Sequence, residues 1–329
     1  MSNISEEAQV SLLLFGTLGK QAEGAEPLTL SQFNVFEEAV TRLGHRLTDL
    51  LTDESIIDPI CKSTDGDKRI RKKIEADNIL KLIRRGVLLS FCLEKWSPYG
   101  ITVLCRSDPL YPKRLLSHLG NRAPPVIYYA GNSTLLTGGG MAYVGARDAS
   151  NESLDAVRTV VKLYTDRNEP TVSGGARGVD ETSMTTALEL GGSVIGALSG
   201  DLMKTCVKPT YRDALAAGKL LLFTAVDPSV GFTPINAMER NKYIYAMADT
   251  CFVAQSGTDG GTWSGAVEEL KRVNHRLVYV FEPADAPEGN RLLISKGGVA
   301  WKPGFDPFNT STPAIRVALP NGQASLDFF

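Results

Sequence analysis

From about residue 96 onward, short apolar runs rich in β-branched and aromatic residues alternate with stretches of helical pattern. These runs predict eight strands, at residues 101–105, 126–131, 142–146, 170–175, 193–199, 219–226, 250–255 and 276–282. Many of them are apolar throughout, which is typical of strands that are buried on both faces of a parallel sheet. Because helical stretches separate the strands, we predict a doubly wound α/β fold with a mostly parallel sheet.

The predicted helices between these strands cover residues 153–168, 180–190, 212–217, 239–248 and 264–274. The first part of the chain differs, because it shows helical periodicity without strand-like runs. Apolar residues recur from Phe33 to Leu47 at helical spacing, with Ser31 as the expected N-cap, and a second helix is predicted over 68–85. We therefore expect a small helical N-terminal domain (1–95), the α/β domain (96–300) and an irregular C-terminal tail (301–329).

Composition limits the classes of function. The 329 residues carry a formal net charge of −2, so a site for nucleic acid has to come from a local basic cluster. The five cysteines form no CxxC pair, which indicates reduced thiols, and the three histidines lie far apart, so we expect no metal site. Acidic residues precede the first apolar stretch and no apolar run approaches membrane-spanning length, so we expect a cytoplasmic protein.

Ligands of open parallel sheets bind beyond the carboxyl ends of the strands. The first informative segment there holds Gly145 and Arg147, without the GxGxxG pattern of dinucleotide binding, so no cofactor is expected. The second segment runs from Ser173 through Gly174, Gly175 and Ala176 to Arg177 and enters a helix. Glycine backbone amides and a helix N-terminus favour an anion, and the arginine suits phosphate; the alternative is a plain strand–helix turn.

Two further segments extend this pattern. Arg240, Asn241 and Lys242 begin a predicted helix, and a glycine-rich loop over 256–263 follows the strand at 250–255. The fold would bring the strand ends together, so we expect one pocket of backbone amides with Arg147, Arg177 and Arg240. Such a pocket would bind phosphates. It contains no evident nucleophile–base pair, so we expect no catalytic residues.

The order of these motifs is specific. VGAR (144–147), SGGARGVDETSMTTALELGGSVIGALSG (173–200), FTPINAMERNKYIYAMAD (232–249) and SGTDGGTWSGAVEEL (256–270) resemble the DprA/Smf family of DNA-processing proteins, with the likeness covering about residues 96–282. The resemblance implies an extended Rossmann-like fold and a recombination mediator that is not an enzyme. It also implies a homodimer that binds single-stranded DNA in a basic pocket and delivers the strand to a RecA-type recombinase, as in natural transformation.

Carried over by motif position, the DNA-binding candidates are Gly145, Arg147, Ser173, Gly174, Gly175, Ala176, Arg177, Arg240, Asn241 and Lys242. Tyr243 is a candidate for base stacking, with a core position as the alternative. The chain has Lys208-Pro209 where the family usually has Tyr-Pro. Basic residues nevertheless remain on that edge, which gives a candidate rim of Lys204, Lys208 and Arg212.

Other interpretations stay open. Gln323, Leu326 and Phe328 resemble the short peptide that docks proteins on the replication sliding clamp, the alternative being a tail that packs on its own domain. Gly260-Gly261-Thr262 with Glu268 is similar to the loop of related phosphoribohydrolases, which would make the protein an enzyme. The same pocket would also suit a sensor of small cyclic or linear nucleotides, and RNA is an alternative to DNA.

Overall fold

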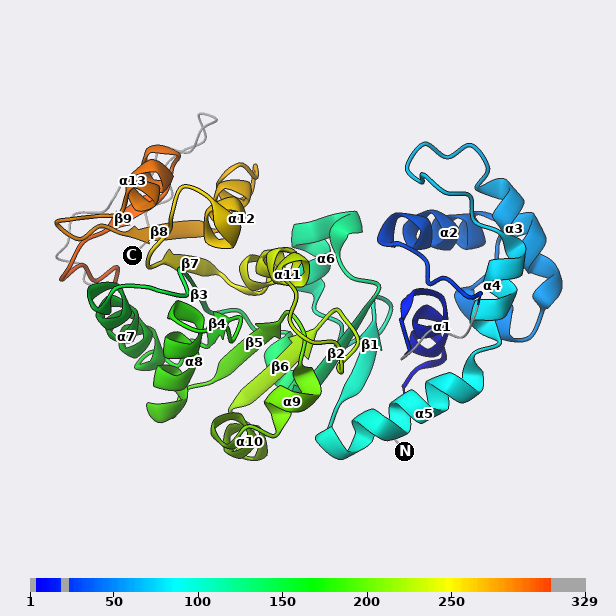
Figure 1. The fold of residues 1–329 in the computed structure, drawn as a ribbon, viewed down its shortest axis with the longest axis horizontal. Coiled ribbons are helices and arrows are strands. Elements are labelled where there is room, and N and C mark those ends of the chain that lie inside the picture. The colour runs from blue at the N-terminus through cyan, green and yellow to red at the C-terminus, as the bar shows by residue number, and fades with distance from the viewer. Residues whose placement is uncertain (1–3, 19–23, 309–329) are drawn as a thin grey trace.

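The computed structural model describes residues 4–18 and 24–308. A helical region at the N-terminal end lies beside a larger α/β region that holds the sheet (Figure 1). No helix in these two ranges has both the length and the apolar character to cross a membrane. Gln323, Leu326 and Phe328, the predicted clamp-binding residues, lie outside the described residues.

Within the described residues, the helical region contains the α-helices α1 (Glu6–Phe15), α2 (Leu30–Arg42), α3 (Ile57–Ser63), α4 (Ala76–Ile83) and α5 (Gly86–Trp96). The predicted N-cap Ser31 is wrong, because Thr29 caps α2 in a reciprocal capping box with Gln32. The helix predicted over 68–85 begins only at Ala76. Its expected first turns instead form an irregular segment, in which Arg69 pairs with Asp67 and Glu38.

In the described ranges, nine strands form one sheet, in the order β1-β2-β6-β5-β4-β3-β7-β8-β9. They are β1 (Thr102–Cys105), β2 (Val126–Gly131), β3 (Met141–Val144), β4 (Thr171–Ser173), β5 (Val194–Leu198), β6 (Leu220–Thr224), β7 (Thr250–Val253), β8 (Leu277–Phe281) and β9 (Val299–Trp301). The pairs β1–β2 and β2–β6 are antiparallel and the others are parallel. The eight predicted strands and the mostly parallel sheet are therefore confirmed, while β9 was not predicted.

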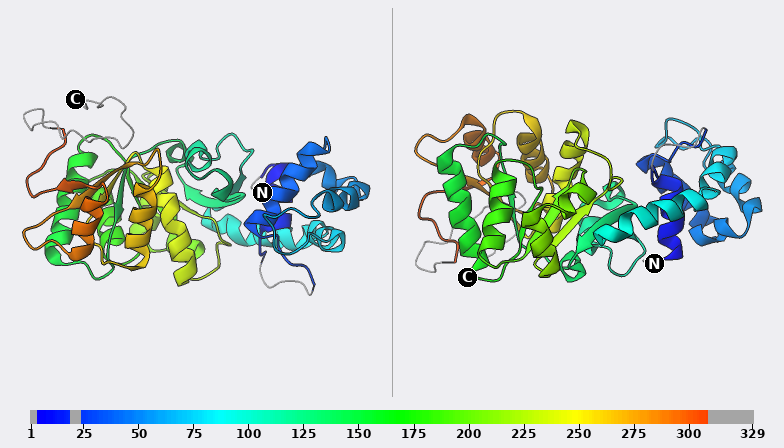
Figure 2. Two further views of the ribbon diagram at one scale, coloured as in Figure 1. Left: turned by 90° about the horizontal axis from the view of Figure 1, so that it is seen from above. Right: turned by 60° about the horizontal axis from the view of Figure 1, so that its bottom comes forward.

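Helices cover both faces of the sheet (Figures 1 and 2). They are α6 (Lys113–Leu119), α7 (Asn151–Thr165), α8 (Val179–Glu189), α9 (Leu202–Cys206), α10 (Pro209–Ala216), α11 (Pro234–Met247), α12 (Gly260–Leu270) and α13 (Glu288–Ser295). Successive residues of β3 point to opposite cores: Tyr143 packs with α7 and α8, whereas Val144 packs with α11 and α12. This burial on two faces explains why the strands are apolar throughout.

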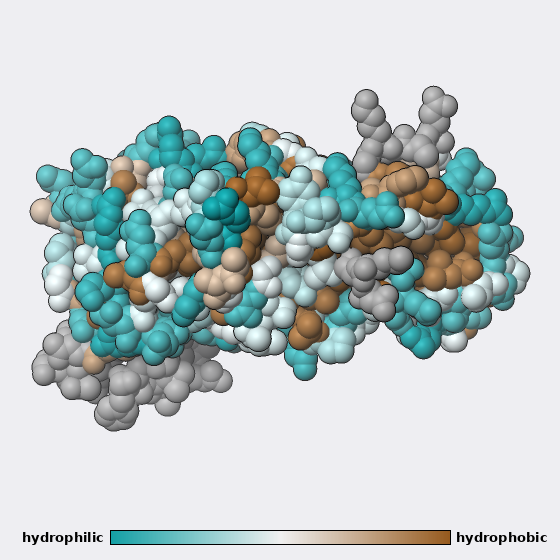
Figure 3. Space-filling view, turned by 90° about the horizontal axis from the view of Figure 1, so that it is seen from below, coloured by the Kyte–Doolittle hydropathy of each residue, from teal (hydrophilic) through white to brown (hydrophobic). Residues whose placement is uncertain are grey.

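The N-terminal helices pack against the β1–β2 end of the sheet. The rings of Trp96, at the end of α5, and Tyr128, in β2, meet edge to face with centroids 5.1 Å apart. The buried guanidinium of Arg85 donates to the carbonyl of Gly16 at the end of α1. Hydrophobic residues also appear on the surface of this region (Figure 3), and Val87 and Phe91 of α5 are exposed.

Candidate functional site

The strand order reverses between β3 and β7, and this is the point at which ligands of doubly wound sheets bind. The loops that follow these two strands are joined by hydrogen bonds. The backbone N–H of Ala146 donates to the carbonyl of Gln255 at 2.9 Å, and the N–H of Ser150 donates to the Gln255 side chain at 2.8 Å. The β3–α7 turn, which carries Arg147, is therefore fixed against the loop after β7.

The loop after β4 packs directly on the β3–α7 turn. Gly178 has a φ of +87°, and a Cβ there would lie 2.5 Å from the carbonyl oxygen of Ala146 and 2.6 Å from that of Arg147. Only glycine permits this approach, because a side chain would overlap the neighbouring backbone. The consequence is that Arg147 and Arg177 project from adjacent turns. Both side chains are exposed, and the Arg177 guanidinium pairs with Asp148.

Arg240, which we expected to share one pocket with Arg147 and Arg177, is buried, unlike those two arginines. Its side chain comes from α11 and is buried, with Nη1 3.0 Å from Oδ2 of Asp180 in the first turn of α8. A Cβ at Gly174 would lie 0.9 Å from this Nη1, so the guanidinium occupies the space that the glycine leaves free. The same Asp180 oxygen lies 3.4 Å from the N–H of Ala176. Arg240 therefore supports the β4–α8 loop from beneath, and it also contributes to the lining of a pocket of about 190 Å³ beside Leu198 and Thr224.

Most of the other candidate residues form hydrogen bonds or ion pairs with other groups of the protein. The Ser173 hydroxyl is buried and donates to the carbonyl of Tyr143 at 2.8 Å. The Asn241 amide donates to the carbonyl of Gly261 at 3.0 Å, which links α11 to the start of α12. Lys242 is mostly buried and pairs with Glu239. Tyr243 is buried among apolar side chains, so of its two interpretations the core position is the one observed.

Gly145 and the predicted basic rim are the remaining site residues that the sequence predicted. A Cβ at Gly145 would lie 2.5 Å from Cγ2 of Val179, so this glycine allows β3 to pack closely on α8. Lys204 on α9, Lys208 just before α10 and Arg212 on α10 are exposed, and Arg212 pairs with Asp213.

Two residues that contribute to the structure around the site were not identified in the sequence analysis. Phe232 precedes α11, is half exposed, and lies under the Arg147 guanidinium, with Cζ 4.6 Å from the ring centroid. Its backbone N–H donates to Oδ2 of Asp201 at 3.3 Å, which brings the loops after β5 and β6 to the same edge. Asn290 is fully buried in α13, and its side-chain amide donates hydrogen bonds to the carbonyls of Ala254 and Phe281. An exposed aromatic residue beside a basic motif is a usable sequence signal, whereas a buried asparagine in a distant helix gives none.

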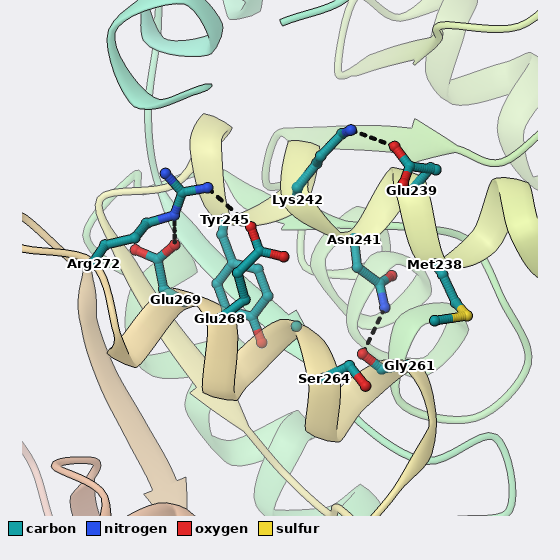
Figure 4. A pocket seen from close by; sticks show the side chains of 11 residues that line it. Met238, Glu239, Asn241, Lys242, Tyr245, Gly261, Ser264, Glu268, Glu269 and Arg272 are labelled. Atoms are coloured by element: carbon teal, nitrogen blue, oxygen red, sulfur yellow. Dashed lines mark hydrogen bonds and ion pairs between the residues drawn. The ribbon is translucent and has the colours of Figure 1, made fainter. Parts of the chain in front are cut away.

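A pocket of about 120 Å³ lies between α11 and α12 (Figure 4). Its charged lining consists of Glu239, Glu268 and Glu269 against Lys242 and Arg272, so carboxylates outnumber cations. Both lining cations are already ion-paired with these carboxylates, which leaves neither of them free for a phosphate group.

Glu268 is engaged by two arginines, with Arg122 at 2.6 Å and Arg272 at 3.2 Å. Burial alone would raise the pKa of Glu268, but the hydrogen bond from Arg122 and the nearby positive charges hold this pKa below its ordinary value. Glu268 is thus held as the ion-pair partner of two arginines.

Comparison with known proteins decides the family. Residues 102–303, from β1 to just beyond β9, match the family model of DNA recombination-mediator protein A. The chain belongs to this family. The resemblance seen in the motifs is thereby confirmed, and the matched region contains every strand of the sheet. No curated protein matches the chain.

Two solved family structures share the fold. DNA processing protein A (DprA) from Streptococcus pneumoniae aligns with a TM-score of 0.68 and 19% identity, over 91% of this chain and 95% of that one. The DprA of Helicobacter pylori, described for its single-stranded DNA binding mode, aligns with a TM-score of 0.50 and 20% identity, over 61% of this chain and 90% of that one. The first alignment extends across the N-terminal helices as well as the sheet.

Proposed function

We propose that this DprA-family protein binds single-stranded DNA along the carboxyl edge of its sheet and delivers the strand to a RecA-type recombinase. The proposal rests mainly on the positions of Arg147 and Arg177, which lie on two adjacent turns whose close packing depends on glycine. Both guanidinium groups reach solvent, and Arg147 has no ion-pair partner within the described residues. A guanidinium binds phosphate oxygens with two parallel hydrogen bonds, which suits the DNA backbone.

Backbone amides support the same role. In the described part of the chain, the N–H groups of Gly175, Arg177 and Gly178 donate to no protein acceptor. They lie immediately before α8, whose N-terminal end carries positive potential. Asp180 would oppose an anion there, but Arg240 neutralises its carboxylate. We therefore assign phosphate contacts to Arg147, Arg177 and these amides, and a positioning role to Arg240.

The test is fluorescence anisotropy with single-stranded and duplex oligonucleotides of one sequence, measured across a range of salt concentrations. We expect preference for the single strand, and a plot of log affinity against log salt with a negative slope. Each phosphate contact contributes about −0.7 to this slope for single strands, so Arg147→Ala and Arg177→Ala should each make it shallower by about that amount.

Arg158→Ala is the matched control, because Arg158 is also exposed and ion-paired but lies on α7. It should leave affinity and slope nearly unchanged. If all three variants behaved alike, or if duplex bound as tightly as single strand, the proposal would be refuted.

The remaining parts of the proposal have separate assays. RecA delivery predicts that the protein accelerates recombinase filament formation on strands covered by single-strand-binding protein. Homodimerisation predicts twice the monomer mass in sedimentation equilibrium. Docking of the sliding clamp by Gln323, Leu326 and Phe328 predicts that removing residues 323–329 abolishes clamp binding. Equal clamp binding by the full-length and the truncated chain would refute docking by this segment.

A further inference from the structure

Three large apolar side chains are exposed where the loop after β6 enters α11. Phe232, Ile235 and Met238 are 47%, 75% and 57% exposed, and we call them the α11 ledge. Thr233 caps the helix by accepting the N–H of Asn236, so this segment is ordered. The spacing of three between Ile235 and Met238 places them on one face of the helix. Grouped exposed apolar side chains of this kind mark a binding surface more often than single ones do.

The ledge adjoins the arginines of the proposed DNA site. The Arg147 guanidinium lies over the Phe232 ring, with 4.6 Å between Cζ and the ring centroid. A cation in this position is attracted by the ring, so each group fixes the orientation of the other. A phosphate on Arg147 would therefore place the attached nucleotide beside an exposed aromatic face.

We infer that the α11 ledge is a stacking platform for the bases of the single strand that Arg147 and Arg177 hold by its phosphates. The inference rests on the proposed function and adds how the protein tells single strands from duplex. Bases of a single strand can turn their faces toward an aromatic ring, whereas those of a duplex are stacked on one another. The occupant is a nucleobase because the apolar ledge is continuous with the Arg147 guanidinium, which has no ion-pair partner within the described residues and can reach a phosphate.

The experiment separates bases from phosphates. Anisotropy is measured with a short oligothymidylate and with a strand of equal length made of abasic sites, which carries the same phosphates without bases. Phe232→Ala should weaken binding of the oligothymidylate by about 5-fold to 150-fold, the range for losing one base–aromatic stack, and should leave the abasic strand unaffected. The salt slope should stay the same, because no phosphate contact is lost.

Three further variants control for other effects. Phe232→Tyr keeps an aromatic face and should bind as the wild type does. Phe232→Leu keeps apolar bulk without the ring and should resemble Phe232→Ala. Phe91→Ala removes a side chain that is 64% exposed on α5, and it should change nothing.

Equal affinities of wild type and Phe232→Ala for the oligothymidylate would overturn the stacking inference and leave the proposed function standing. A matching loss for the abasic strand would also overturn it, because Phe232 would then act only by orienting Arg147. If the wild type bound no single strand at all, the proposed function would fail and the inference with it. A selective effect of the Phe232 variants on a protein partner would likewise count against a nucleobase as the occupant.

Discussion

Replacing Arg240 with methionine removes one half of a buried ion pair and should destabilise the whole carboxyl edge. The side chains of Arg240 and Asp180 are only 5% and 8% exposed. Methionine keeps much of the length of the arginine stem, so the main loss is the positive charge beside Asp180. The carboxylate would retain one long contact, the 3.4 Å approach of the Ala176 N–H.

The expected cost follows from this geometry. Removing one partner of a buried ion pair typically costs about 3–5 kcal/mol, because the remaining charge stays in a medium of low polarity. Pairing Arg240→Met with Asp180→Asn removes both charges and should recover at least about half of that loss. Gly174→Ala tests the same contact from the other side, because its Cβ would displace the guanidinium from the position that it occupies.

Urea unfolding followed by circular dichroism gives the free energies of unfolding for the wild type, both single variants and the double variant. The denaturant slope should stay constant across the set, so that shifts of the midpoint report stability. A loss below about 1 kcal/mol for Arg240→Met would refute the argument that a buried charge is left unpaired. Losses in the double variant that simply add would refute the coupling between Arg240 and Asp180.

Other predictions concern the surroundings of the site. Asp148→Asn frees the Arg177 guanidinium from a surface ion pair worth about 0.2–1 kcal/mol, so oligonucleotide affinity should rise by up to about 5-fold; a decrease in the anisotropy assay would contradict this. Asn290→Ala removes the side chain that bonds three buried backbone groups, and it should lower the free energy of unfolding in urea by about 3 kcal/mol or more. A near-neutral result would show that other contacts fix the loop after β7. Burial raises the pKa of the Cys61 thiol to about 12 and that of Cys206 to about 11, so at pH 8 the native protein should resist a thiol reagent that labels all five cysteines after denaturation. Rapid native labelling would contradict that burial.

The sheet could be predicted because its strands are buried on both faces, which leaves continuous apolar runs in the sequence. The end of the sheet could not, because β9 is only three residues long and carries no periodicity of its own. The start of α2 shows a similar limit. Ser31 and Thr29 are both good caps, and only the contact of Gln32 with the Thr29 backbone selects one of them.

The glycine-containing turns of the site could be predicted from the sequence, but which of its side chains are buried could not. The motifs placed Arg147 and Arg177 at strand ends, and the structure puts them on adjacent exposed turns. Nothing local shows that Gly174 leaves room for Arg240, or that Asp180 lies opposite, because these contacts join elements that are distant in the chain. Tyr243 lies within the basic motif and was the predicted stacking residue, but its position on α11 belongs to the core, whereas the exposed Phe232 lies before the helix.

A crystal structure of the protein with a short oligothymidylate tests the central claim most directly. We predict phosphates within hydrogen-bonding distance of Arg147 and Arg177 and of the amides before α8, with a base against Phe232. A strand bound instead across α9 and α10, on the face of α5, or in the acidic pocket between α11 and α12 would contradict the account.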